Sequence, residues 1–207
     1  MCFKSNFKLL LYLGFIFLFF FPAGAEDLKN KEKVLFFVSQ TDFRDEEYLK
    51  PKKILMKAGY DVVTISNTKE QASGMLGAKI MPNMALSAVK TSAGYAAFVI
   101  VGGSGAIKYE WENRDLIALI RDFYQNSKII AAISRAPVVV AQAKVLEKKL
   151  ATVANIKEAK QEFKKYKVKY ISKDIVIAGN IVTADGPQTA HVFGKTIMKL
   201  LLKGEKK

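Results

Sequence analysis

Short runs of apolar residues alternate with segments that repeat apolar and polar residues at helical spacing. Each apolar run is continuous, which is typical of strands that are buried on both faces. The intervening helical patterns predict an α/β sandwich with a mostly parallel central sheet and helices on both faces. The predicted strands are 33–39, 60–65, 96–101, 128–133, 150–153, 174–178 and 180–183, and the predicted helices are 113–125, 137–146, 157–165 and 188–203.

Two further stretches are less regular. Residues 45–58 have helical spacing but contain Pro51, so we expect this helix to begin near the proline and to end at Gly59. Residues 66–94 are rich in glycine and predict a short hairpin or extended arm followed by a brief helix. The Gly179-Asn180 pair predicts a tight turn in a closing hairpin.

Parallel sheets bind ligands beyond the carboxyl ends of their strands. Three predicted loops meet that edge: residues 41–47, the turn at Gly102-Gly103, and the turn at Ser134. Ser134 ends a strand and precedes a helix that opens with Pro137, and several enzyme folds place a nucleophile on such a turn. The alternative is that Ser134 has no chemical role and is a small residue that a tight turn tolerates.

The amino terminus has the pattern of a signal peptide. Lys4 and Lys8 precede an apolar run from Leu9 to Pro22, and the sequence Ala23-Gly24-Ala25 follows as a cleavage site. We expect residues 1–25 to direct export to the periplasm or the exterior, 26–32 to form a polar leader, 33–203 to form a single domain, and 204–207 to form a charged tail. The alternative is an uncleaved anchor, for which the apolar run is short.

The chain is strongly basic, with a net charge of +14. Without residues 1–25 it keeps 33 − 2 = 31 basic and 19 acidic residues, a net charge of +12. Only four of the basic residues are arginine, whereas specific nucleic-acid recognition depends on arginine forks. We therefore predict a solvated lysine surface with no specific nucleic-acid partner and at most weak attraction to anionic membranes.

The composition argues against metal, cofactor and thiol chemistry. The chain has a single histidine, His191, and a single cysteine, Cys2, which cleavage would remove. Carboxylates do not cluster at ligand spacing, so we expect no metal, and no phosphate-binding glycine motif is present, so we expect no cofactor. A mature chain without a thiol cannot sense oxidation through cysteine.

Four segments resemble the ThiJ/PfpI superfamily, whose flavodoxin-like fold is related to class I glutamine amidotransferases. They are DEEYLKPKKILMKAGYDV, VIVGGSG, AAISRAPVVVA and IVIAGNIVTADGPQTAHVFG, and GMLGAKIMPNMALS resembles the PfpI-type subgroup. The third segment resembles the family pattern AAICxxP, with serine in place of the nucleophilic cysteine. Together the segments span nearly all of residues 33–203.

The resemblance implies a site. Ser134 falls at the nucleophile position, Glu47 at the carboxylate that hydrogen-bonds it, and the Gly102-Gly103 turn and Arg135 at the backbone oxyanion donors. Arg135 stands where many members have a histidine, and Val153 stands in the region where others have one. His191 receives no catalytic role and is interpreted as a partly packed helix residue.

With Ser134 at the position of the nucleophilic cysteine, three candidate functions remain. Family members are described as peptidases, glyoxalases, deglycases, chaperones or redox sensors, and their covalent chemistry uses the cysteine. Serine needs a general base, and only Glu47 is available for that role. We favour a non-redox binding or protective protein that holds a small carbonyl or anionic compound. The alternatives are a slow serine hydrolase or peptidase, and a holdase-like interaction protein.

The resemblance also implies a homodimer or a larger homo-oligomer. The methionine-rich segment 74–86 is the candidate interface, and an arm that covers the core is the alternative. Tyr109 and Trp111 are candidates for the pocket mouth or for a subunit contact.

Overall fold

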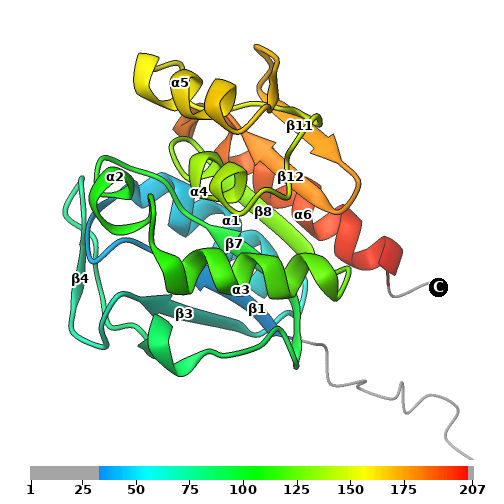
Figure 1. Ribbon diagram of the computed structural model, residues 1–207. Helices are drawn as coiled ribbons and strands as arrows, with labels where there is room; N and C mark the ends of the chain where they lie inside the picture. The colour runs from blue at the N-terminus through cyan, green and yellow to red at the C-terminus, as the bar shows by residue number, and fades with distance from the viewer. Residues whose placement is uncertain (1–32, 205–207) are drawn as a thin grey trace, which may run out of the picture. The chain divides into compact units, whose positions relative to one another are not determined.

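A computed structural model describes residues 33–204, which form one central sheet covered by helices on both faces (Figure 1). The sheet has seven strands in the order β11-β12-β8-β7-β1-β3-β6. All neighbours are parallel except β11 and β12, which form an antiparallel hairpin. The strands are β1 (Lys33–Phe37), β3 (Val62–Ser66), β6 (Met84–Ala85), β7 (Tyr95–Ile100), β8 (Ile129–Ile133), β11 (Ile175–Ala178) and β12 (Ile181–Ala184). The predicted α/β class and mostly parallel sheet are confirmed.

The continuous apolar strands contribute to two separate cores. In β1, Leu35 and Phe37 pack into one core, whereas Val34 and Phe36 pack into the other. This division follows from the pleat, because successive side chains of a strand point to opposite faces. A strand between two helical layers therefore carries apolar side chains on both of its faces.

Helices cover both faces of the sheet. Helices α3 (Arg114–Gln125), α4 (Pro137–Gln142) and α5 (Lys157–Lys165) contribute to the first core, and α1 (Asp45–Lys57) and α6 (Ala190–Gly204) contribute to the second. Figure 1 shows α3 and α4 in front of the sheet and α1 and α6 behind it. The short helical elements are α2 (Ala106–Tyr109), η1 (Leu86–Ala88) and η2 (Pro187–Thr189).

Most predicted boundaries lie within two residues of the observed ones. The helix predicted over 137–146 instead ends at Gln142, and the chain then turns through Lys144, whose φ is +63°. The strand predicted over 150–153 lies outside the central sheet, since β9 (Leu150–Ala151) pairs with β10 (Lys169–Tyr170). The irregular region contains the predicted hairpin, formed by β4 (Ala72–Gly74) and β5 (Lys79–Ile80), and β2 (Thr41–Phe43) completes this three-stranded sheet.

The expected start of the first helix was wrong. Helix α1 begins at Asp45, six residues before Pro51. Asp45 accepts hydrogen bonds from the amides of Leu76 (2.8 Å) and Ala78 (2.7 Å) in the β4–β5 connection, and this long-range contact anchors the first turn. Pro51 lies in the helix interior, where Gly194 of α6 packs against it.

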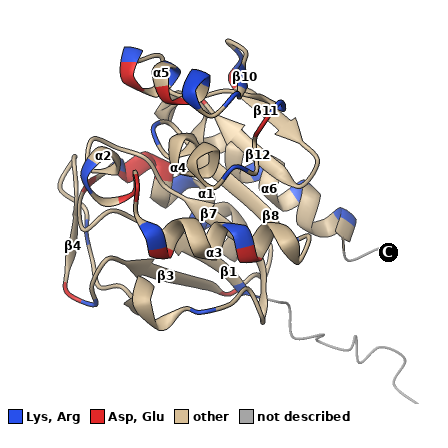
Figure 2. Ribbon diagram, in the orientation of Figure 1, with Lys and Arg blue, Asp and Glu red and all other residues tan. Residues whose placement is uncertain are grey.

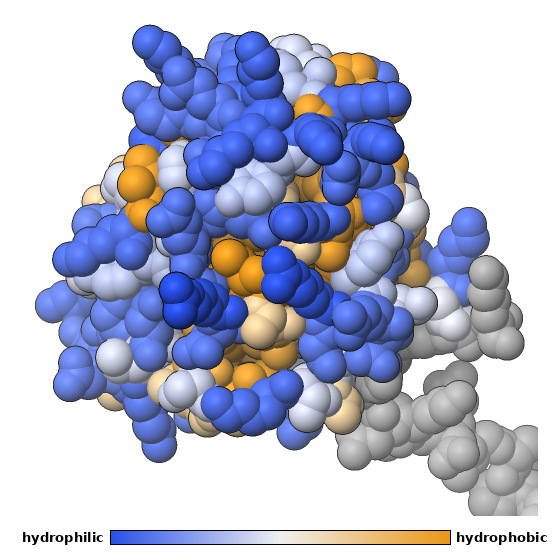
Figure 3. Space-filling model, viewed as in Figure 1, coloured by the Kyte–Doolittle hydropathy of each residue, from blue (hydrophilic) through white to orange (hydrophobic). Residues whose placement is uncertain are grey.

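The visible surface is mainly hydrophilic, with small hydrophobic patches between the charged side chains (Figure 3). Within residues 33–204, no helix is both long enough and apolar enough to cross a membrane. The predicted signal peptide and polar leader lie outside the described residues.

Candidate functional site

The three loops predicted at the carboxyl edge of the sheet come together around the Gly102-Gly103 turn. The amide of Arg44 donates to the carbonyl of Gly102 (2.9 Å), and Phe43 forms an antiparallel bridge with Gly103. A Cβ atom on Gly102 would lie 2.5 Å from the carbonyl oxygen of Ile133 and 2.8 Å from the Cβ atom of Ser134. Glycine is therefore required for β7 to pass this close to the end of β8.

Ser134 occupies a sharp turn between β8 and α4. Its φ is +61°, a left-handed conformation that costs a residue with a Cβ atom about 1–2 kcal/mol. Two backbone hydrogen bonds maintain it: the Ser134 amide donates to Ala184 (2.9 Å), and the Ser134 carbonyl accepts from Ala154 (2.8 Å). The serine is only 9% exposed. Its geometry matches the strand-to-helix turn predicted from the sequence.

Trp111 contacts the sharp turn at Ser134-Arg135, which we call the elbow. Its indole Nε1 donates to the carbonyl of Arg135 (3.1 Å), and its ring packs against the core that includes α3 and α4. Tyr109 is half-buried nearby, and its carbonyl accepts from Asn67 and Asn113. The sequence predicted both aromatics as candidates for a pocket mouth or a subunit contact, but it did not predict the hydrogen bond from Trp111 to the elbow.

Glu47 lies in the first turn of α1, where three consecutive acidic residues begin the helix (Figure 2). It is fully buried, and burial raises its pKa from 4.5 to about 8. The Ser134 hydroxyl, the Gly102 amide and Arg44 oppose this rise in pKa. Neither carboxyl oxygen makes a well-aligned hydrogen bond within the described part of the chain. The structure thus brings Glu47 and Ser134 together, as the resemblance implied.

The backbone amides of Gly103 and Arg135 are the remaining predicted groups. Among the hydrogen bonds of residues 33–204, no backbone carbonyl accepts from either amide. Gly103 has a φ of +121°, and a Cβ atom there would overlap the carbonyl of Asp42. A side chain at position 103 is therefore excluded, and the buried Gly103 backbone packs against the Asp42–Arg44 segment.

Sequence reasoning missed a second buried carboxyl group. Glu110, at the end of α2, is fully buried and accepts a hydrogen bond from the Ser39 hydroxyl (2.9 Å). Burial raises its pKa to about 8, and the negative charge of Glu47 contributes to the rise. Glu110 lies in the polar stretch YEWEN, which resembles a solvated turn, so no local signal distinguishes it.

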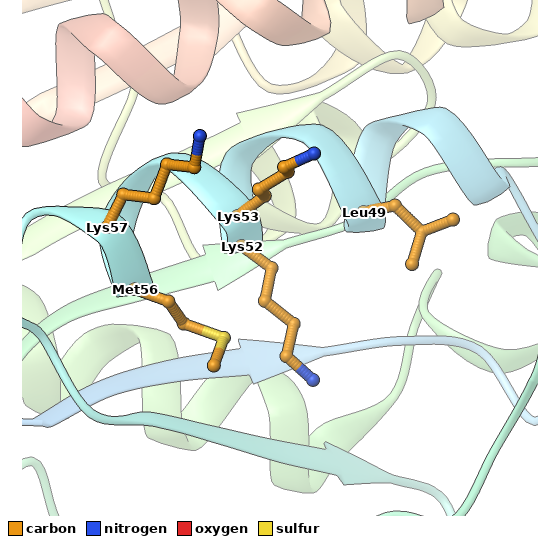
Figure 4. Close-up of a pocket in the computed structure, with 5 residues that line it drawn as sticks. All are labelled: Leu49, Lys52, Lys53, Met56 and Lys57. Atoms are coloured by element: carbon orange, nitrogen blue, oxygen red, sulfur yellow. The ribbon is translucent and has the colours of Figure 1, made fainter.

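The remaining candidate residues do not contribute to the site at Ser134. Val153 is buried in the core, and His191 is exposed at the start of α6 rather than partly packed. Within residues 33–204, no set of three or more histidine, cysteine or acidic residues is placed to hold a metal ion. A shallow surface groove lies on the outer face of α1, lined by Leu49, Lys52, Lys53, Met56 and Lys57 (Figure 4).

Comparison with known proteins agrees with this architecture. The DJ-1/PfpI family model matches residues 32–200. An uncharacterized protein of Methanocaldococcus jannaschii is 40% identical over 178 residues, 86% of each chain, and a glutathione-independent glyoxalase of Caenorhabditis elegans is 24% identical over 85% of this chain and 92% of its own.

A solved structure extends the comparison to the fold. The ThiJ/PfpI domain protein of Brachyspira murdochii superposes with a TM-score of 0.79 and 31% identity, covering 84% of this chain and 98% of its own. The family match spans most of the chain, and the solved structure shares the same arrangement of sheet and helices. This chain therefore belongs to the DJ-1/PfpI family.

Proposed function

We propose that this protein is an exported DJ-1/PfpI protein that binds a small carbonyl or anionic compound at the Ser134 elbow, with little or no catalysis of the family type. Relatives in the family are named as a glyoxalase, two deglycases and a putative cysteine protease. The observation that carries the proposal is the pairing of a serine, rather than a thiol, with a buried carboxyl group whose pKa is about 8.

The protonation of Glu47 argues against nucleophilic catalysis at neutral pH. With a pKa of about 8, roughly nine-tenths of the Glu47 side chains are protonated at pH 7. A protonated carboxyl group cannot accept the proton of the Ser134 hydroxyl, and serine has no thiolate form. The same group donates a hydrogen bond, as carboxylic acids in apolar sites do when they stabilise an oxyanion.

The donors around the elbow define the ligand class. The Glu47 carboxyl and the Ser134 hydroxyl adjoin the Gly102-Gly103 turn, and the Gly103 and Arg135 amides have no backbone acceptor among the described residues. Such an arrangement suits a carbonyl oxygen or a carboxylate, which accepts several hydrogen bonds at once. The absence of a carbonyl acceptor for these amides supports binding without requiring a covalent step.

One observation favours a second candidate, a serine hydrolase. When Glu47 is ionised, its raised pKa makes it a stronger base than an ordinary carboxylate. Ser134 then has a neighbouring base and nearby amides for an oxyanion. This activity would increase as the pH rises through about 8, because only the ionised form of Glu47 accepts the proton.

An intact-mass experiment separates the two functions. The purified exported protein is treated with a fluorophosphonate probe at pH 7 and at pH 9, with Ser134→Ala as the matched control. We expect no adduct at either pH, and a starting mass that lacks residues 1–25. A single adduct that grows with pH and is absent in Ser134→Ala would establish the hydrolase instead. A mass that retains residues 1–25 would contradict cleavage.

Binding is measured on the same protein with pyruvate, a small anion that also carries a carbonyl group. We expect pyruvate to shift the amide resonances of Gly103 and Arg135 in a saturable way at pH 7, and to shift them less at pH 9. Unchanged amide resonances at millimolar pyruvate would contradict the binding function for this ligand class.

A further inference from the structure

Helices α1 and α6 lie side by side over the same face of the sheet (Figure 1). They pack closely, since a Cβ atom on Gly194 of α6 would lie 2.8 Å from the Cα atom of Pro51 of α1. Each helix buries one side in the second core, so its other side points away from the sheet. We call this shared outward surface the α1–α6 face.

The α1–α6 face is rich in lysine and poor in acid. Helix α6 contains no acidic residue, and the three acids of α1 all lie in its first turn. Of these, Asp45 and Glu47 are buried, and Glu46 pairs with Arg44 at 2.8 Å. The exposed lysines follow one another at intervals of three or four residues, which places them on one side of each helix. They are Lys50, Lys53 and Lys57 on α1, and Lys195, Lys199 and Lys203 on α6.

Exposed apolar side chains lie among these lysines. Leu49 and Met56 line the shallow groove on α1 together with three lysines (Figure 4). Val192 and Leu202 are exposed on α6. The four side chains are between 38% and 55% exposed. The face therefore combines positive charge with apolar groups whose exposure to water is unfavourable.

The other lysine-rich helix, α5, lacks this combination. Glu158 and Glu162 lie among its lysines. Lys165 pairs with Glu162 at 3.4 Å, and Lys167, just beyond the helix, pairs with Glu147 at 3.6 Å. Within residues 157–165, all of which the structure describes, no large apolar side chain is exposed. A high lysine content alone therefore does not distinguish the α1–α6 face, whereas its lack of acids and its apolar side chains do.

The chemistry of the face selects among possible partners. A symmetric contact with a second copy would bring lysines against lysines, with no exposed unpaired acid from either helix between them. A nucleic acid supplies negative charge, but its phosphate backbone offers no apolar partner for Leu49 and Met56, and neither helix contains arginine. An anionic membrane supplies charged head groups for the lysines and an acyl boundary for the apolar side chains.

We propose that the α1–α6 face binds the surface of a membrane that contains anionic phospholipids. The lysines contact the head groups, and Leu49 and Met56 enter the boundary between head groups and acyl chains. From the sequence we expected at most weak attraction to such membranes. The fold gathers six exposed lysines from two separate segments on one surface, which strengthens the expected binding. The inference does not depend on what the elbow binds.

The test measures cosedimentation of the purified exported protein with vesicles at pH 7. One set of vesicles is phosphatidylcholine alone, and the other contains about one third phosphatidylglycerol, which is anionic. We expect saturable binding to the anionic vesicles only, at about 0.1 M NaCl, and weaker binding at about 0.5 M NaCl, because salt screens the attraction. Vesicles of phosphatidylcholine alone also control for binding through residues 1–25.

A triple variant locates the charged part of the contact. Lys53→Gln/Lys57→Gln/Lys199→Gln, the face variant, removes three charges from exposed positions. Each lysine near an anionic surface contributes about fivefold to binding, so we expect the partition coefficient to fall about 100-fold.

The matched control, Lys157→Gln/Lys164→Gln/Lys169→Gln, removes the same charge from exposed positions on α5 and β10. Helix α5 contributes to the opposite core, so these lysines lie across the sheet from the α1–α6 face. That separation exceeds the Debye length of about 10 Å at 0.1 M salt, and we expect a change of no more than about threefold.

A double variant tests the apolar part of the contact. Leu49→Gln/Met56→Gln keeps every charge of the face. We expect binding to anionic vesicles to weaken at least about tenfold, because two side chains lose their burial in the membrane. Binding to heparin, a polyanion with no apolar phase, should not change.

Four results would each overturn the proposal. The first is no binding of the unmodified protein to anionic vesicles, and the second is an equal loss of binding in the face variant and its α5 control. The third is unchanged vesicle binding in Leu49→Gln/Met56→Gln, which would assign the face to polyanions in general. The fourth is a homodimer that the face variant converts to a monomer in sedimentation equilibrium, which would assign the face to a second copy of the chain.

Discussion

Replacing Glu47 by glutamine is expected to change how the stability of the protein depends on pH. The folded chain holds the Glu47 proton up to pH about 8, whereas an ordinary glutamate loses it near 4.5. Between these values the folded state binds more protons than the unfolded state, so stability falls as the pH rises. The contribution is fully present below pH 4.5 and is lost as the pH rises through about 8.

The size of the effect follows from the width of that window. Each pH unit changes the free energy of unfolding by about 1.4 kcal/mol for one proton. From pH 4.5 to pH 7, ionisation of unfolded Glu47 therefore lowers the stability by about 3 kcal/mol. Glutamine at position 47 makes no pH-dependent contribution to stability, because it is neutral in both the folded and the unfolded state. Unmet hydrogen bonds of its amide add a cost that does not depend on pH.

The assay is urea unfolding at pH 5.5, 6.25 and 7, comparing the unmodified chain, Glu47→Gln and the control Glu162→Gln. We expect the difference in stability between Glu47→Gln and the unmodified chain to increase by about 2 kcal/mol across this range, in favour of the variant. Glu162→Gln should show no comparable trend. An equal pH dependence for Glu47→Gln and the unmodified chain would refute the reasoning, because it would mean that Glu47 ionises normally in the fold.

Two other predictions concern packing and assembly. Gly194→Ala should destabilise the fold by about 1–3 kcal/mol in thermal or urea unfolding, because its Cβ atom would lie 2.8 Å from the Cα atom of Pro51, whereas Gly204→Ala meets nothing within 4 Å and should be neutral. Leu76 and Met81 are 60% and 65% exposed on the segment that we propose as a subunit interface. Replacing both by lysine should convert a homodimer to a monomer in sedimentation equilibrium; an unchanged mass would place the contact elsewhere.

The pattern of residues along the chain determined the fold class. Continuous apolar strands such as 96–101 are required wherever both faces of a sheet are covered. Such a run can be recognised from the sequence alone. The elbow at Ser134 was also predictable, since a strand, a small-residue turn and an N-terminal helix proline are local signals. The partnership of Glu47 with Ser134 came from resemblance to a family rather than from spacing.

Only the tertiary structure decided the features that depend on distant segments. The start of α1 at Asp45 depends on amides more than 30 residues away, and these outweigh the local signal of Pro51. The raised pKa of Glu47 depends on its burial beside the Gly102 turn, and the hydrogen bond of Glu110 comes from a hydroxyl 71 residues distant. Sequence patterns record which residues are apolar, but desolvation and charge interaction act between groups that only the fold places together.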